Sequence, residues 1–114
     1  MTHSAIFARF MAYIEYLETE QGISSAYELD HYQIQVLNNI FTAQTRSERI
    51  CVSDILALRE IASPATLHAA LHQLIHKKLV TYKTQRDSRI KLIELTHLGW
   101  KRFDELSQFI KTSI

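Results

Sequence analysis

The stretch that decides the fold is SPATLHAALHQLIHKKLV, residues 63–80, which joins a helix-start signal to an apolar stripe. Ser63 can cap free backbone amides, and Pro64 stands where a helix needs no amide hydrogen. We therefore predict a helix that begins after Ser63 and buries one face. The apolar face repeats at helical spacing and the outer face is short and polar. The inner set is Leu67, Ala70, Leu71, Leu74 and Ile75, and the outer set is Ala65, Thr66, His68, Ala69, His72, Gln73 and His76.

A β-hairpin is predicted directly after this helix. Residues 79–84 and 90–95 alternate and carry Val, Tyr, Thr and Ile, which are typical of strands. The charged segment 85–89 lies between them and forms the tip. A helix followed by a basic hairpin is the outline of a winged helix-turn-helix, a shape that can grip a duplex.

The rest of the chain is predicted to be helical around this core. We expect helices over 4–20, ending before Gly22, and from Asp30, whose side chain caps the start. Residues 50–52 could form a small strand, and Ser53 is expected to cap a short third helix. Thr96 is expected to cap the last helix. The predicted class is mostly α with a small β-hairpin: a single winged helix-turn-helix domain over 1–114, with its core at 50–95 and dimerisation helices at 4–22 and 97–114.

Length and composition exclude several classes of protein. The 114 residues suit one domain, and 46% apolar with 22% charged residues is ordinary globular composition. A single cysteine, Cys51, excludes an intramolecular disulfide and a cysteine-rich zinc site, and it is expected to be a small core residue. Because no leader or membrane-spanning segment is recognisable, we expect a cytoplasmic protein with no membrane partner.

Charge is distributed unevenly although the net charge is only +1. Residues 1–58 contain three basic and seven acidic residues, a net charge of −4. Residues 59–102 contain nine basic and three acidic residues, a net charge of +6. The predicted helix-turn-helix and wing therefore form the basic part of the chain, as binding to a polyanion requires.

Residues 50–100 resemble MarR-type winged-helix transcription regulators, most clearly at Ala65-Thr66, at Lys77-Lys78-Leu79-Val80 and from Asp87 to Gly99. The resemblance implies that the helix after Ser63 enters the major groove, that the wing reaches the minor groove and that the terminal helices pair two subunits. It also implies that Arg89 is the wing arginine and Asp87 the aspartate that steadies it.

The sequence departs from that family at two positions and in length. Ala69 stands where many members have a DNA-contacting arginine, and Lys78 replaces the usual glycine after the recognition helix. A left-handed backbone is easier there without a side chain. The chain is also shorter than most members, so a small-molecule effector is possible but unsupported.

The predicted DNA contacts come from the outer helical face and the wing. Side chains at the helix can reach base edges or phosphates, and cations of the wing can neutralise phosphates and enter the narrow minor groove. The predicted contact residues are Ser63, Pro64, Ala65, Thr66, His68, Ala69, His72, Gln73, Lys83, Arg86, Asp87, Arg89 and Lys91.

Three histidines lie at i, i+4 and i+8 on the outer face: His68, His72 and His76. Adjacent members could share a metal, but no acidic residue or cysteine of that helix completes a tetrahedral set. We expect surface or DNA-facing histidines and assign no metal or cofactor, although the sequence does not decide the point.

Aromatic residues are concentrated in the terminal helices, with Phe7, Phe10, Tyr13 and Tyr16 at the front and Trp100, Phe103 and Phe109 at the back. They indicate a partner surface that pairs two copies of the chain, and the alternative is that they only close the monomer core.

The leading hypothesis is a homodimeric, sequence-specific regulator of transcription that binds double-stranded DNA. The alternative is a winged-helix module that binds proteins and ignores DNA. An enzyme is not expected, because no catalytic grouping or Gly-rich phosphate loop is recognisable.

Overall fold

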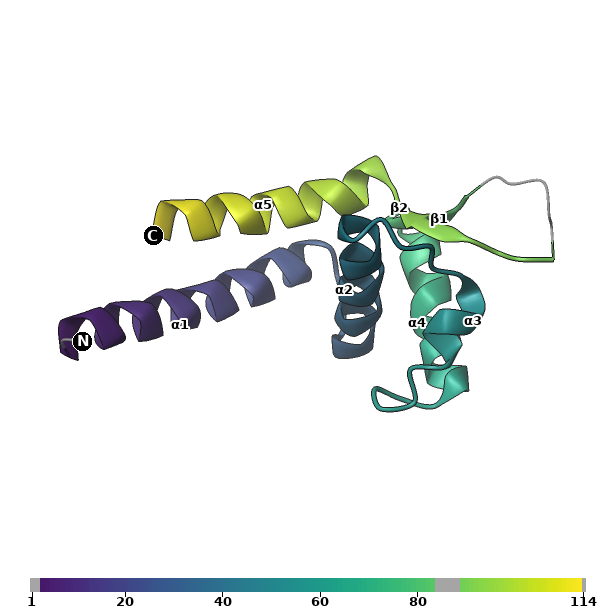
Figure 1. Cartoon of the computed structure of the whole chain (residues 1–114), viewed down its shortest axis with the longest axis horizontal. Helices are drawn as coiled ribbons and strands as arrows, with labels where there is room; N and C mark the ends of the chain where they lie inside the picture. The colour runs from purple at the N-terminus through teal and green to yellow at the C-terminus, as the bar shows by residue number, and fades with distance from the viewer. Residues whose placement is uncertain (1–2, 84–88, 114) are drawn as a thin grey trace. The chain divides into compact units, whose positions relative to one another are not determined.

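The structure, a computed structural model, describes residues 3–83 and 89–113 (Figure 1). The described residues form two compact units, Asp30–Trp100 and the segments before Asp30 and after Trp100. The predicted class is confirmed, since helices dominate and the strands form one hairpin. The elements in chain order are α1 (His3–Ala26), α2 (His31–Thr45), α3 (Val52–Leu56), α4 (Pro64–His76), β1 (Val80–Tyr82), β2 (Ile93–Leu95) and α5 (His97–Ser113).

The core of the unit Asp30–Trp100 lies between α2 and α4, with α3 and the hairpin against α4. The predicted inner face of α4 is confirmed except at Ile75, which is only half-buried. On α2, Leu37 and Ile40 are buried, while Ile34 and Phe41 are half-buried. Each fully buried aliphatic side chain contributes about 1.5–3 kcal/mol to folding. The buried apolar residues of the three helices are Val36, Leu37, Ile40, Ala43, Ile55, Leu67, Ala70, Leu71 and Leu74.

The hairpin is antiparallel, and its strands are shorter than predicted. Val80 pairs with Leu95 and Tyr82 with Ile93. The predicted strand at 50–52 is reduced to one isolated bridge, in which Cys51 pairs with Leu92. Val52 already belongs to α3, and its amide donates to the Lys91 carbonyl at 3.0 Å, so the bridge includes the first residue of the helix.

Helix starts agree with the sequence at α2 and differ at α3. The Asp30 carboxylate accepts a hydrogen bond from the Gln33 amide at 2.8 Å, as expected for an N-cap. The predicted cap at Ser53 is wrong, because α3 begins at Val52, two residues earlier than that cap implies, and Cys51 is its N-cap residue. The Asp54 carboxylate accepts from the Cys51 amide at 2.9 Å and from its thiol at 3.1 Å. Cys51 is therefore a half-buried capping residue rather than the core residue expected.

The other unit pairs α1 with the later part of α5, and Figure 1 shows the two helices side by side and antiparallel. α1 is longer than predicted, because it continues through Gly22 to Ala26. The fully buried Arg102 guanidinium forms an ion pair with the carboxylate of Glu20 and donates to Ser24 Oγ at 3.2 Å. Removing one partner of such a buried pair leaves an uncompensated charge, so this contact holds the two helices in register.

A second polar contact joins the turn just after α1 to α5. The Tyr27 hydroxyl donates to the Glu105 carboxylate at 3.2 Å. Burial and the neighbouring Glu105 carboxylate raise the pKa of Tyr27, because both disfavour the charged phenolate. Burial, followed by the charge of Glu20, likewise raises the pKa of Tyr16. Both phenols are therefore neutral donors at physiological pH.

α1 leaves large apolar side chains in contact with solvent. Among the described residues, no helix combines the length and the apolar character that crossing a bilayer requires. The exposed fractions of the α1 side chains reach 63% at Phe7, 59% at Tyr13 and 56% at Phe10. An exposed apolar surface of this kind indicates a contact with another macromolecule.

The two glycines provide a matched test of the fold. A Cβ at Gly99 would lie 2.4 Å from the backbone oxygen of Leu79 and 3.2 Å from the Leu95 side chain, whereas a Cβ at Gly22 would meet nothing within 4 Å. We predict that Gly99→Ala lowers the free energy of unfolding by about 1–3 kcal/mol, because it overpacks the hairpin–α5 contact. Gly22→Ala should raise the free energy of unfolding by about 0.5–1 kcal/mol, because Gly22 lies inside α1, where alanine favours the helix more than glycine and its methyl group meets nothing. Urea unfolding followed by circular dichroism measures both, and equal effects would contradict this packing.

Candidate nucleic-acid interface

α4 begins where the sequence predicted. The Ser63 hydroxyl oxygen accepts from the Thr66 amide at 3.3 Å, and the same hydroxyl lies 3.0 Å from Thr66 Oγ1. Pro64 occupies the first turn and needs no hydrogen-bond acceptor there. Capping of this kind fixes the first turn, which in a recognition helix is the part that contacts base edges.

The outer face of α4 is open to solvent in the described unit. Leu67, Leu71 and Leu74 are fully buried against α2, so helical periodicity turns the opposite side outward. Thr66 differs from its neighbours because it is half-buried and shares the cap with Ser63. The exposed candidate residues are Ser63, Pro64, Ala65, His68, Ala69, His72 and Gln73.

The candidate residues of the wing are divided between described and undescribed segments. Lys83, Arg89 and Lys91 are exposed. The Lys83 amide donates to the Leu92 carbonyl at 2.9 Å, which continues the hairpin one residue beyond β1. Arg86 and Asp87 lie outside the described residues, as does the expected contact between Asp87 and Arg89.

The turn between α4 and β1 is held by hydrogen bonds and by one residue in the left-handed conformation. Lys78 has a φ of 63°, the left-handed conformation that a glycine usually supplies, so the turn keeps this backbone although a lysine replaces the glycine. Thr96 Oγ1 donates to the Lys78 carbonyl at 2.6 Å and accepts from the Gly99 amide at 3.1 Å. Thr96 therefore caps α5, as predicted, and also holds the turn between α4 and β1 through its bond to Lys78.

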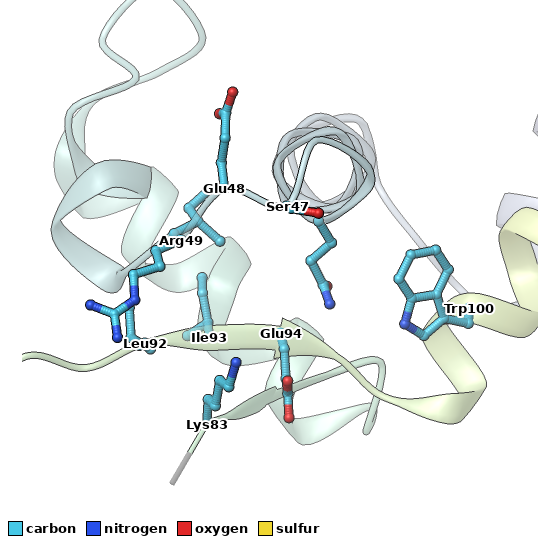
Figure 2. Close-up of a pocket in the computed structure, with 10 residues that line it drawn as sticks. Ser47, Glu48, Arg49, Lys83, Leu92, Ile93, Glu94 and Trp100 are labelled. Atoms are coloured by element: carbon cyan, nitrogen blue, oxygen red, sulfur yellow. The ribbon is translucent and has the colours of Figure 1, made fainter. Parts of the chain in front are cut away.

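A pocket of about 300 Å³ lies beside the base of the wing (Figure 2). Gln44 reaches from α2 into this region, and its side-chain oxygen accepts from the Leu95 amide at 2.6 Å. Trp100 stands at one end and makes an edge contact with Phe41, with ring centroids 5.6 Å apart. The lining residues are Gln44, Ser47, Glu48, Arg49, Ile50, Lys83, Leu92, Ile93, Glu94 and Trp100.

Sequence reasoning missed this pocket, because its walls come from three segments that are distant in the chain. The lining combines two cations, two carboxylates and an indole, so the pocket does not select one class of ligand. No residue signalled the pocket in the sequence, because Gln44 is one of several polar residues of α2.

Of the three histidines predicted on the outer face, two are brought together. The rings of His68 and His72 have their centroids 4.2 Å apart, at an interplanar angle of 41°. His76 is exposed one turn further on. Within residues 3–83 and 89–113, no group of three or more histidine, cysteine or acidic side chains could hold a metal ion.

Comparisons with known proteins place the fold. No protein-family model matches the sequence, and no curated protein matches it. Solved structures of MepR from Staphylococcus aureus do match. A point variant bound to an oligodeoxyribonucleotide has a TM-score of 0.70 at 21% identity, with 98% of this chain and 78% of that chain covered. The MepR–DNA complex gives 0.68 at 19% identity, covering 90% and 82%.

A third structure is that of MepR described as a transcription regulator of the multidrug efflux pump MepA. Its TM-score is 0.64 at 20% identity, with 98% of this chain and 78% of that chain covered. The chain has a MarR-like winged helix-turn-helix fold. The resemblance seen in residues 50–100 thus extends, as a fold, over nearly the whole chain.

The cap of α4 gives a direct test of the local structure. We predict that Ser63→Ala lowers the free energy of unfolding by about 1 kcal/mol, because the Thr66 amide loses its acceptor. Ser53→Ala is the control, since Ser53 lies inside α3 rather than at its cap, and it should change stability by less than about 0.5 kcal/mol. Chemical denaturation of the three proteins measures the difference. A larger loss for Ser53→Ala would contradict both cap assignments.

Proposed function

We propose that the chain is a sequence-specific, double-stranded-DNA-binding regulator of transcription that acts as a homodimer in the cytoplasm. The observation that carries the proposal is the two-sided character of α4, whose apolar side is buried while its capped, polar side is exposed. In this proposal α4 enters the major groove and the wing follows the adjacent minor groove. No reaction is part of it.

Charge supports a nucleic acid as the partner of this unit. The basic residues of the chain are concentrated in 59–102, which includes α4 and the wing. Lys83, Arg89 and Lys91 are exposed on the hairpin arms, where cations can displace the counterions condensed on phosphates. The matched MepR structures include DNA complexes of that protein, and this supports the same use of the shared fold here.

A second copy of the chain is the proposed partner of α1. Ile6, Phe10, Tyr13 and Leu17 recur at i, i+4, i+7 and i+11, which keeps them on one side of the helix, and all four are exposed. Burying this side against the same side of another copy removes it from water and gives a two-fold dimer. Two recognition helices related in this way can reach successive major grooves.

The DNA-binding proposal predicts a steep dependence on salt and on one wing residue. A duplex selected from a random library should bind less tightly as salt rises, because phosphate contacts release counterions. Arg89→Ala should cost about 1–3 kcal/mol of binding free energy, because the guanidinium occupies the minor groove. Fluorescence anisotropy with the labelled duplex measures both.

Arg46→Ala is the matched control for that experiment, because Arg46 is exposed, carries the same charge and is not a proposed contact. Equal affinities of wild type and Arg89→Ala would refute the role of the wing. Failure to select any duplex would refute DNA binding itself. Protein capture after nuclease treatment would then favour the protein-binding alternative.

The dimer has its own test. We predict that Phe10→Asp shifts the protein from dimer to monomer, because an unpaired carboxylate in an apolar interface is strongly unfavourable. Tyr32→Asp on α2 is the control, since Tyr32 is also exposed, at 41%, but does not belong to the α1 side. Light scattering after size-exclusion chromatography gives the mass of each. A wild-type monomer, or a Phe10→Asp dimer, would contradict the interface.

A further inference from the structure

His68 and His72 form a preassembled pair of imidazoles on the exposed face of α4. They lie one helical turn apart, and their ring centroids are separated by 4.2 Å. Both side chains are exposed. In the part of the chain that the structure describes, neither imidazole has a hydrogen-bonding or ionic partner, so lone pairs of both rings are available to a ligand.

The chemistry of such a pair is that of a metal chelate. A neutral imidazole nitrogen is a preferred ligand of Zn²⁺, Ni²⁺ and Cu²⁺. Two nitrogens bound at about 2.0–2.1 Å to one tetrahedral ion stand roughly 3.3 Å apart. Rings one turn apart on a helix reach this separation by small rotations of their side chains, and exposure leaves those rotations free.

We propose that His68 and His72 bind one divalent transition-metal ion, of the class that prefers imidazole ligands, on the outer face of α4. The protein supplies two ligands and water completes the coordination shell, since no larger ligand group exists among the described residues. The site is therefore exchangeable, unlike a closed structural zinc site.

Charge favours this pair over His72 with His76. His76 is the last residue of α4, and Lys77 and Lys78 follow it directly. The Lys77 ammonium donates to the Gln33 side-chain oxygen on α2 at 2.8 Å, so the exposed Lys78 supplies the charge that opposes a divalent cation in that turn. His68 lies two turns earlier, and its neighbours three and four residues away include Pro64, Ala65 and Leu71, which carry no charge.

The test is a titration of the free chain with ZnCl₂, with no DNA present. Calorimetry should show one strong site per chain, and Zn²⁺ should shift the NMR signals of the His68 and His72 rings. His68→Gln and His72→Gln should each weaken binding more than about tenfold, because removing a ligand costs at least as much as removing its support. Circular dichroism checks that these surface variants remain folded.

Two control variants make the assignment specific. His97→Gln removes an exposed histidine at the start of α5 and should bind Zn²⁺ like the wild type. His76→Gln should also leave binding unchanged. Loss of binding in His76→Gln but not in His68→Gln would overturn the assignment, and so would wild-type affinity in both His68→Gln and His72→Gln.

A consequence for regulation rests on the proposed function. Imidazoles that hold an ion cannot contact bases at the same time, so metal and duplex compete, and by linkage each weakens the other. Duplex affinity of the wild type should fall when Zn²⁺ is added, while the double variant His68→Gln/His72→Gln should not respond. If no duplex binds, the proposed function fails, yet the titration of the free chain still decides the metal site.

Discussion

The packing of α4 against α2 is the contact on which the rest of the unit Asp30–Trp100 depends. Leu67, Leu71 and Leu74 are fully buried, and they face fully buried side chains of α2 such as Leu37 and Ile40. A helix has only one rotation about its axis that buries this stripe. The same rotation exposes Ala65, His68 and His72, so the functional face is set by the hydrophobic effect on the opposite side.

The wing depends on the α4–α2 contact indirectly, because the hairpin begins at the end of α4. The Leu79 amide donates to the Leu74 carbonyl at the end of α4, and the chain then turns through the left-handed Lys78. Thr96 and Gly99 close the turn from the other side, and Gly99 leaves no room for a side chain. Helix, hairpin and the first turn of α5 therefore share one tightly packed joint. A change in any of the three is transmitted to the direction of the wing.

The unit formed by α1 and the later part of α5 obeys a different constraint. It has a buried ion pair, Arg102 with Glu20, and an exposed apolar side on α1. The ion pair specifies how the two helices meet, because an unpaired buried charge is costly. The apolar side of α1 stays exposed to solvent within the described unit. The proposed dimer rests on this side of α1.

The sequence by itself determined the helix class, the caps at Asp30, Ser63 and Thr96, and the inner stripe of α4, because these follow from interactions between residues a few positions apart. It failed where distant segments compete. Cys51 caps α3 because the hairpin edge reaches it, and Gln44 and Trp100 meet at a pocket across more than fifty residues of chain. Local spacing already placed the three histidines on one face of α4, and the side-chain rotamers in the structure bring the rings of His68 and His72 together.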